Sequence, residues 1–368
     1  MSRIRTAILG VVAALLIPAA GAAPAVAAPA PAVGGTPEVY VSPTGNDSNP
    51  GTKTRPVRTI DRGFALAQAG TTILLMPGTY TGDVTPAKGG SAAGGLITLK
   101  SQVPHAAKIV GGFYVDRPYL RIEGLEITGA NVDYAMDVVA SHIRLINNKI
   151  HHISQKKAGN DNGGSGMEIY TDDYGPLSDI VIDRNMVYDI GLGPGKDELT
   201  QGIYLSVKCT GCRVTNNIVF DVTDFGIHSY HSPNGWIVAN NTVFNNGRGI
   251  LTGPNFTVVN NISYGNRKLH SDFDLRGGGS TVAGNMSFGR GKVTAPGVQV
   301  ADPMFVNYTG DETGDVHLRL GSPALDTGVA GGAPAFDFDR VARPQGNGFD
   351  IGAYERPVAG TCAQPEGS

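Results

Sequence analysis

Short apolar runs, separated by polar stretches, recur along most of this chain. Residues 180–182 and 236–238 are typical: they are too short and too rich in β-branched or aromatic residues for helices, and they predict strands. A two-residue motif, usually with Asn at its second position, follows many of these runs. The second position of the pair is Gly at residue 124 and Asn at residues 148, 185, 217, 241, 261 and 285. The spacing returns repeatedly to 20 or 24 residues, with two longer gaps, which indicates a solenoid.

One repeat of about 24 residues with two or three short strands has the length of one coil of a parallel β-helix. We therefore predict an all-β fold, with the β-helix as a single domain over residues 36–357. The repeated Asn residues are predicted to be scaffold. At a coil corner an Asn can adopt the left-handed conformation, and its side chain can bond to the equivalent Asn one coil away.

The two ends of the repeat region differ from its middle. Residues 59–69 have helical spacing with Thr59 as a plausible N-cap, so we expect a helix that covers the open end of the first coil. Residues 301–305 begin a closing segment without repeats.

Residues 1–27 combine a basic start, a short apolar run and small residues, which predicts a cleaved signal peptide and a secreted, extracellular protein. An Ala/Pro-rich linker is expected over residues 28–35, and a flexible tail over residues 358–368. In an exported chain, the C-x-x-C pair Cys209 and Cys212 favours a local disulfide, with Cys362 left over.

Composition narrows the function classes. The chain has 29 Lys and Arg against 32 Asp and Glu, a net charge of −3, which leaves no basic footprint for nucleic acid. With 52 Gly, 23 Pro and 17% charged residues, it suits short strands and tight turns better than a helical bundle. We expect a monomer that has no membrane association once the signal peptide is removed.

A second strand follows each Asn corner, and its copies share one phase. Inward-pointing residues are expected to be Met136, Met167, Ile203, Ile227, Ile250 and Phe273. The alternation then places an outward column made of Asp137, Glu168, Tyr204, His228, Leu251 and Asp274. A second outward column consists of Val139, Tyr170, Ser206, Tyr230, Gly253 and Arg276. We call these two columns the polar strip; Asp172, Asp173, Lys208 and His231 are expected beside it.

Long insertions at residues 151–164 and 191–201 are expected to wall the polar strip into a shallow groove. Tyrosine faces can pack on sugar rings, and Arg or Lys can pair with uronate carboxylates, so the groove suits an extended acidic polysaccharide. The alternative is that any water-facing side of a solenoid is polar. We favour a site because the strip is rich in His and Tyr.

The two ends of the predicted domain resemble a known family. Residues 40–47 (YVSPTGND), 56–69 and 74–80 (LLMPGTY) resemble the start of secreted right-handed parallel β-helix proteins of the pectate-lyase-like superfamily. Residues 302–305 (DPMF), 317–320 (HLRL), 322–328 (SPALDTG) and 350–355 (DIGAYE) resemble the ends of such proteins. Among named enzymes, polysaccharide lyase family 9 is the most similar. The resemblance implies a right-handed coil.

The same resemblance bears on chemistry. Family 9 lyases have a Gly-aromatic-Lys run at the strand of the catalytic base, and residues 226–228 (GIH) stand at the matching place. Their neighbouring coil carries a carboxylate-rich calcium run, where this chain has residues 200–204 (TQGIY). The resemblance therefore supports the position of His228 and implies that the family's calcium site is missing.

Eliminative cleavage of a uronate polymer needs a base for the C5 proton, an acid for the leaving oxygen and a cation on the carboxylate. We predict His228 as the base, Tyr204 as the acid, and Lys208 or Arg276 as the carboxylate clamp; Lys208 is the alternative base. The predicted substrate-binding residues are Glu168, Tyr170, Tyr230, His231, Asp274 and Arg276.

Two other functions stay open. A glycoside hydrolase could use Glu168 with Asp137, or either of them with Asp172 or Asp173, as its pair of carboxylates. A non-catalytic glycan-binding or surface protein could use the same groove. Asp172 and Asp173 are also candidate Ca²⁺ ligands together with Glu168, and the alternative is a loop turn that uses Asp for backbone bonds.

Overall fold

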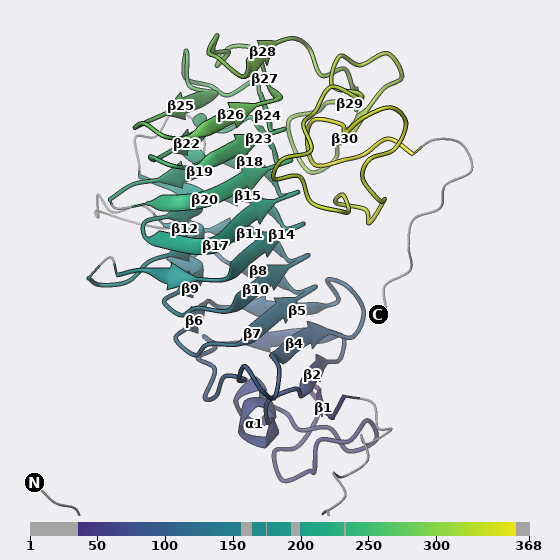
Figure 1. Ribbon diagram of the computed structural model, residues 1–368. Coiled ribbons are helices and arrows are strands. Elements are labelled where there is room, and N and C mark those ends of the chain that lie inside the picture. The colour runs from purple at the N-terminus through teal and green to yellow at the C-terminus, as the bar shows by residue number, and fades with distance from the viewer. Residues whose placement is uncertain (1–35, 156–163, 174, 193–198, 232, 358–368) are drawn as a thin grey trace, which may run out of the picture. The chain divides into compact units, whose positions relative to one another are not determined.

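Three stacked parallel sheets make up most of the described protein (Figure 1). The computed structural model describes residues 36–155, 164–173, 175–192, 199–231 and 233–357. The expected signal peptide, linker and tail, Cys362, and much of the two insertions lie outside the described residues. Within the described ranges, each full coil gives one strand to each sheet, and the strands of every sheet pair in parallel with those of the next coil.

The 11-stranded sheet holds the strands that precede the Asn corners. They are β1 (Glu38–Val41), β2 (Thr72–Leu75), β4 (Ile97–Ser101), β7 (Leu120–Glu123), β10 (Ile143–Ile146), β14 (Ile180–Asp183), β17 (Lys208–Thr215), β20 (Asn234–Ala239), β23 (Thr257–Val259) and β26 (Thr281–Ala283), with β13 (Leu177–Ser178) beside β17.

The 10-stranded sheet holds the strands that follow those corners. They are β3 (Gly78–Thr81), β5 (Ala107–Val110), β8 (Glu126–Gly129), β11 (Lys149–Ile153), β15 (Met186–Ile190), β18 (Ile218–Val222), β21 (Thr242–Phe244), β24 (Ile262–Tyr264), β27 (Asn285–Phe288) and β28 (Val298–Val300). The 7-stranded sheet completes the coils. It holds β6 (Phe113–Val115), β9 (Tyr134–Val138), β12 (Ser165–Ile169), β16 (Gln201–Leu205), β19 (Phe225–Ser229), β22 (Arg248–Thr252) and β25 (Phe273–Leu275).

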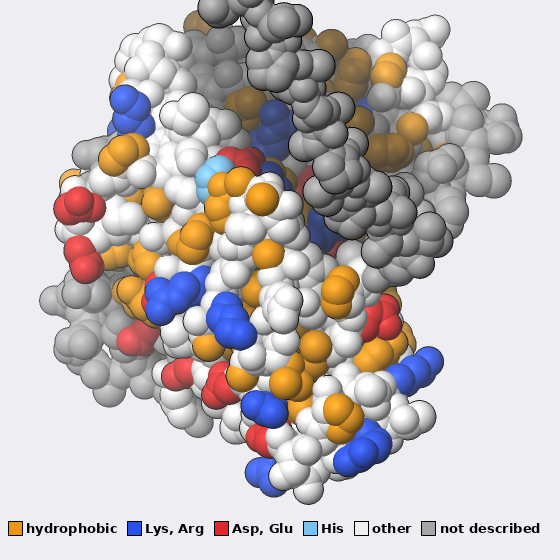
Figure 2. Space-filling model, turned by 60° about the horizontal axis from the view of Figure 1, so that its bottom comes forward, with side chains coloured by type: hydrophobic (Ala, Val, Ile, Leu, Met, Phe, Trp, Pro, Cys, Tyr) orange, Lys and Arg blue, Asp and Glu red, His pale blue; other side chains and the backbone are white. Residues whose placement is uncertain are grey.

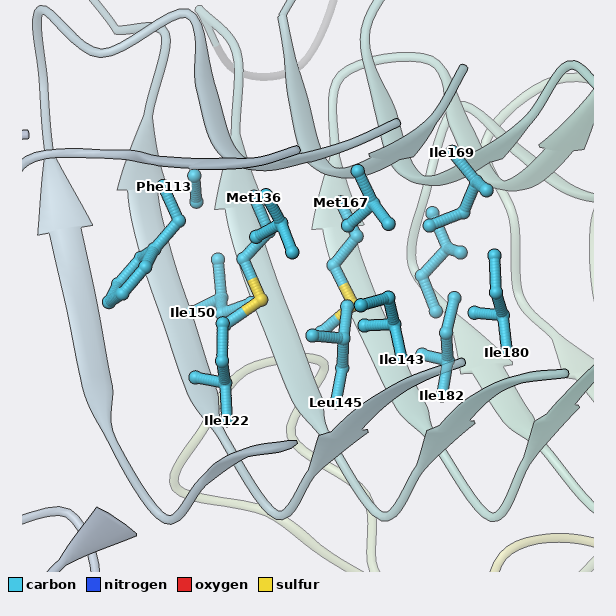
Figure 3. Close-up of a cluster of buried hydrophobic side chains, with 14 of the residues drawn as sticks. Phe113, Ile122, Met136, Ile143, Leu145, Ile150, Met167, Ile169, Ile180 and Ile182 are labelled. Atoms are coloured by element: carbon cyan, nitrogen blue, oxygen red, sulfur yellow. The ribbon is translucent and has the colours of Figure 1, made fainter. Parts of the chain in front are cut away.

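The space between the sheets is filled by apolar side chains, which confirms the predicted all-β solenoid. Met136 and Met167 of the 7-stranded sheet point toward Ile122 and Leu145 of the 11-stranded sheet, respectively (Figure 3). These side chains are fully buried, and equivalent positions in successive coils lie one above another. The regular stack explains why the sequence period is visible at all: each coil must supply the same apolar positions to its neighbours.

The Asn corners form the predicted ladder, with one correction of register. From Asn185 onward, each second Asn accepts hydrogen bonds on its side-chain oxygen from the backbone and the side chain of the equivalent Asn in the preceding coil, whereas Asn148 accepts from the backbone of Leu125. The side-chain bonds measure 3.1 Å for Asn148–Asn185, 3.0 Å for Asn185–Asn217, 3.0 Å for Asn217–Asn241, 2.9 Å for Asn241–Asn261 and 3.0 Å for Asn261–Asn285.

The left-handed conformation belongs to the residue before each ladder Asn, as at Asn147 and Asn216. Gly124 shares this conformation, because its neighbour Glu123 pairs with Ile146. Leu125 therefore stands at the second position of the earliest copy, and the alignment of Gly124 with the second Asn was wrong by one residue. The left-handed backbone and the ladder of side-chain hydrogen bonds, both expected of one Asn, therefore belong to two neighbouring residues.

The first residue of several corner pairs anchors the closing segment, which lies beside the coils in yellow in Figure 1. Asn240 donates from its side chain to the carbonyls of Asp350 and Gly352, and Asn260 exchanges two 2.8 Å bonds with the backbone of Val329. The segment includes an antiparallel pair, β29 (Phe305–Asn307) and β30 (Asp315–Leu318). Its apolar side chains form a second core with outward residues of the 10-stranded sheet, including Phe220, Phe244 and Ile262.

A short helix, α1 (Ile60–Leu66), covers the first coil, at the purple end of Figure 1. Thr59 is its N-cap and accepts a 3.1 Å bond from the backbone of Arg62, as expected. The helix ends three residues earlier than the predicted 59–69 span, because Ala67 already has an extended backbone. Ile60 and Phe64 are buried against the first coil.

Cys209 and Cys212 form the favoured disulfide within β17. Figure 2 shows the face near α1, where positive and negative side chains are interspersed among apolar ones. In the described part of the chain, no helix has the length and apolar character that a membrane span requires.

Candidate functional site

The outward column of the polar strip has the predicted register on the 7-stranded sheet. Asp137 pairs with Glu168, Glu168 with Tyr204, Tyr204 with His228, His228 with Leu251, and Leu251 with Asp274. The neighbouring inward residues, such as Ile203 and Ile227, belong to the central core, whereas these residues do not. The structure therefore brings Glu168, Tyr204 and His228 onto three adjacent strands with their side chains outside the coil.

The centre of the strip is covered rather than solvated, contrary to expectation. Tyr204 is 8% exposed and His228 is 6% exposed. The His228 ring lies on Phe225 with centroids 3.9 Å apart, and Tyr204 and Tyr230 approach it at 5.3 and 6.0 Å. Aromatic rings thus shield the imidazole on several sides and hold its orientation.

The environment of His228 favours the neutral imidazole. Burial, followed by the positive charges of Arg276 and Arg248, lowers the pKa of His228 to about 4. The Nδ1 atom is buried, and none of the described residues forms a hydrogen bond with it. At neutral pH, His228 is therefore an uncharged ring that can accept a proton.

Two carboxyl groups at the other end of the column have raised pKa values, in contrast to His228. Burial and the nearby charge of Asp172 raise the pKa of Asp137 to about 6. Burial and the charge of Asp137 raise the pKa of Glu168 to about 7. One oxygen of Asp137 is buried without a hydrogen-bond partner among the described residues. Such a pair holds protons near neutral pH, which is the property of acid–base groups in active sites.

A pocket of about 280 Å³ opens beside His228, and its walls include residues that the sequence analysis missed. Phe225 and Arg248 line it, and the Arg248 guanidinium lies 4.6 Å from the centroid of the Phe225 ring. Arg248 also forms a 2.5 Å ion pair with the buried Asp224. The sequence repeat could have indicated Arg248, because Arg248 pairs with Phe225 of the preceding coil. It was missed because it is the first residue of its strand, whereas the sequence analysis compared only the outward positions later in each strand.

The predicted binding residues differ in how they are placed. Asp274 lines the same pocket and holds Arg276 through bonds of 2.9 and 2.6 Å. Tyr230 is 54% exposed, and the His231 ring lies 4.8 Å from it and 6.5 Å from Tyr204. Tyr170 is partly exposed in the second column. Within that column Ser206 is fully buried, and its hydroxyl donates a hydrogen bond to the carbonyl of Ile169.

Lys208 lies apart from the column. It is exposed, begins β17 in the 11-stranded sheet and pairs there with Asn234. The register thus places it beyond the corner that separates the two sheets. The sequence analysis placed Lys208 at the edge of the strip because it could not locate this corner.

The candidate calcium ligands do not assemble a site within the described residues. Asp173 accepts a 2.9 Å bond from the backbone of Gly175, as a turn residue does. Asp172 acts on Asp137 through its charge. Across the described ranges, no three His, Cys, Asp or Glu side chains gather closely enough to hold a metal ion. The Ca²⁺ assignment stays a prediction.

Comparisons with known proteins agree with this architecture. A family model described as "Right handed beta helix region" matches residues 111–287, and one described as "Protein of unknown function (DUF1565)" matches residues 43–86. Pectate lyase L of Dickeya dadantii (strain 3937) is 27% identical over 293 residues, which cover 68% of this chain and 65% of that protein. The uncharacterized protein YwoF of Bacillus subtilis (strain 168) is 27% identical over 210 residues, 51% of this chain and 42% of that one.

Among solved structures, that of pectate lyase Pel9A is similar, with a TM-score of 0.66 and 20% identity. The match covers 88% of this chain and 98% of that one. The coils, their parallel register and these likenesses define the fold as a right-handed parallel β-helix, and the chain is similar in sequence to pectate lyases. The right-handed parallel β-helix fold that the family resemblance implied is thereby confirmed.

Proposed function

We propose that the protein is a secreted polysaccharide lyase that cleaves an acidic, uronate-containing polymer by β-elimination at the polar strip. The observation that carries this proposal is the outward column Glu168, Tyr204, His228, in which a neutral imidazole and a proton-holding carboxyl flank a phenol on successive strands. The similarity to pectate lyases supports the same reaction class.

In this proposal His228 takes the proton from C5 of the sugar ring. The electron pair of the C5–H bond forms the C4–C5 double bond, the C4–O bond breaks, and Tyr204 gives its phenolic proton to the leaving oxygen. The pKa of His228 is low in the free protein. A bound uronate carboxylate would offset the charges of Arg276 and Arg248 and raise that pKa toward the range of an effective base.

The positively charged side chains around the pocket can supply the third requirement, a cation that holds the uronate carboxylate. Arg248 and Lys268 line it, and Arg276 stands next to Asp274 on the strip. Guanidinium groups can hold a uronate carboxylate in two parallel hydrogen bonds and stabilise the charge that develops when the C5 proton leaves. Lys208 remains the alternative base from the sequence, although its place in the 11-stranded sheet gives that role less support.

A hydrolase on the same strip is the second candidate, because Asp137 and Glu168 lie on adjacent strands and both have raised pKa values. One protonated and one ionised carboxyl is the arrangement that glycoside hydrolysis requires. The lyase is favoured because the covered imidazole has no role in that hydrolysis.

The test is incubation of the purified protein with a panel of polyuronides, with ultraviolet absorbance of unsaturated uronates and reducing ends followed separately. Both signals together would support the lyase, and reducing ends alone would support the hydrolase. Retention on a polysaccharide column without either signal would support a non-catalytic glycan-binding protein. The variants His228→Ala and Lys208→Ala distinguish the two candidate bases. Full activity in both variants would show that the proposed catalytic site is wrong.

A further inference from the structure

Two histidines stand side by side on the outer face of the 10-stranded sheet, away from the polar strip. His151 and His152 are consecutive residues of β11, where the register with β8 shifts between His151 and Ile153. His152 has a left-handed backbone, with φ of 56°. Because of this irregularity, two neighbouring side chains that would alternate in a regular strand meet on one side.

Each imidazole is oriented by a carboxylate from a different coil. The Nε2 atom of His151 lies 3.1 Å from Glu126 of β8, and the Nε2 atom of His152 lies 3.2 Å from Asp189 of β15. The two Nδ1 atoms face each other at 2.6 Å. Tyr188 stacks on the His151 ring at 5.0 Å and fixes its plane.

The protons in this network can be counted. One carboxylate oxygen of Glu126 lies 2.9 Å from the Lys108 ammonium and 3.1 Å from Nε2 of His151. An ionised carboxylate accepts a hydrogen bond, which places a proton on Nε2 of His151. The Nε2 atom of His152 likewise faces a carboxylate oxygen, that of Asp189, at 3.2 Å. With both Nε2 atoms protonated, the two Nδ1 atoms would present lone pairs to each other at 2.6 Å, which is repulsive unless a cation lies between them.

We propose that His151 and His152 form the protein half of a binding site for a divalent transition-metal ion of the class that prefers imidazole, such as Zn²⁺ or Cu²⁺. In the absence of metal, one shared proton occupies the position between the Nδ1 atoms. Metal binding displaces that proton to solvent, and both imidazoles become neutral ligands through Nδ1.

The chemistry of the surroundings supports a metal rather than a proton alone. Metal-ligating histidines characteristically donate their other ring N–H to a carboxylate, which fixes the tautomer and increases ligand basicity; both rings here have that partner. Neutral imidazole suits Zn²⁺ and Cu²⁺ better than Mg²⁺ or Ca²⁺. Glu126 and Asp189 also contribute two negative charges close to the ion.

The site is accessible and can adjust. The His152 side chain is 52% exposed, whereas that of His151 is 9% exposed, so His152 can move to widen the gap between the Nδ1 atoms. The described residues offer no third His, Cys, Asp or Glu in ligating position, and water would complete the coordination. Because Glu126, His151 and Asp189 lie in three successive coils, a bound ion would also tie those coils together.

The experiment uses the full-length protein without a histidine tag. Zn²⁺ is titrated calorimetrically at neutral pH in two buffers with different ionisation enthalpies, and Cu²⁺ is followed by electron paramagnetic resonance. We expect one ion per chain, proton release on binding, and hyperfine coupling to two nitrogens. His152→Asn, which keeps a residue suited to the left-handed backbone, should lower the affinity by more than tenfold, and Asp189→Asn by about tenfold.

His142→Ala is the matched control, because His142 also pairs with a carboxylate, at 3.0 Å from Asp179, but lacks a second imidazole. Its affinity for Zn²⁺ should equal that of the wild type. Circular dichroism without metal checks that each variant is folded. The proposal is overturned if Zn²⁺ does not bind, if His152→Asn binds as tightly as the wild type, or if His142→Ala weakens binding as much. None of these readouts depends on the proposed lyase activity.

Discussion

The side-chain oxygen of Asn241 accepts two hydrogen bonds from Asn217 in the preceding coil, one from its backbone N–H at 2.9 Å and one from its side-chain amide at 3.0 Å. Asn217 in turn accepts the same two bonds from Asn185 and donates to the carbonyl of Ile182. Each interior Asn thus satisfies buried backbone groups of two coils at once. The ladder is the polar counterpart of the apolar stack inside the coils.

Replacing Asn217 by Leu should lower the free energy of unfolding by at least about 2 kcal/mol, because several buried donors and acceptors lose their partners together. Chemical denaturation followed by circular dichroism measures the change. Thr281→Val, an exposed position in β26, is the control and should stay within about 0.5 kcal/mol of the wild type. A loss for Asn217→Leu as small as that of the control would mean that the ladder is not stabilising.

Glu168→Gln should stabilise the folded protein at mildly alkaline pH. The pKa of Glu168 is raised to about 7 in the folded state, so between about 4.3 and about 7 the folded state binds more protons than the unfolded state. Stability from this group is therefore lost as pH rises through that window. The variant removes the buried charge and should gain about 1 kcal/mol or more above pH 7.

The difference between Glu168→Gln and the wild type should shrink toward zero at acidic pH, where Glu168 is already neutral. Thermal midpoints measured from acidic to alkaline pH would show this convergence. A pH-independent difference would argue that the change comes from packing and not from the ionisation of Glu168.

The sequence was sufficient for the repeat and for the phase of the polar strip, because both follow from residues that must recur in every coil. The covering of His228 by Phe225 was not foreseen. That contact joins two residues of one strand that the alternation does not place together, and it depends on ring orientations that a period does not encode. The position of Lys208 at the start of β17 was not foreseen for a related reason, because the sequence did not reveal the corner between β16 and β17.

Contacts between distant parts of the chain were also beyond the sequence analysis. Asn240 and Asp350 meet across 110 positions, and the first residue of a corner pair gives no local sign that it anchors the closing segment. The irregularity at His152 was hidden for another reason: the repeat was aligned on the Asn corners, and a residue added within β11 changes only the spacing to the next corner.

Glu355→Ala should release the closing segment or strongly destabilise it. Arg343 and Glu355 form an ion pair at 2.7 Å with both side chains fully buried, and Arg343 also donates to the carbonyl of Gly352. Removing one partner leaves a buried guanidinium unpaired, at a cost of about 3–5 kcal/mol. Limited proteolysis and thermal unfolding would report the change. The double variant Arg343→Met/Glu355→Leu should be less destabilised than Glu355→Ala alone, and the opposite order would contradict this account.

The rate of cleavage should depend on the protonation of His228 at low pH and of Asp137 and Glu168 at higher pH. The free protein has a His228 pKa of about 4, and its Asp137 and Glu168 carboxyls have pKa values of about 6 and about 7. As pH falls through about 4, His228 gains a proton and cannot act as a base, so kcat/KM should fall. As pH rises through about 6 to 7, Asp137 and Glu168 become anions beside an anionic polymer, and binding should weaken. We therefore expect an acidic optimum.

Variants can separate the two limbs of that profile. His228→Ala should lower kcat by about a hundredfold or more at the optimum, as loss of a general base does, with the fold intact by circular dichroism. Glu168→Gln should keep most of the activity and move the alkaline limb to higher pH, because one of the two repelling charges can no longer form. If the alkaline limb is unchanged in Glu168→Gln and in Asp137→Asn, the two carboxyls do not meet the substrate. If His228→Ala retains full activity, the base lies elsewhere, and Lys208→Ala becomes the next variant to measure.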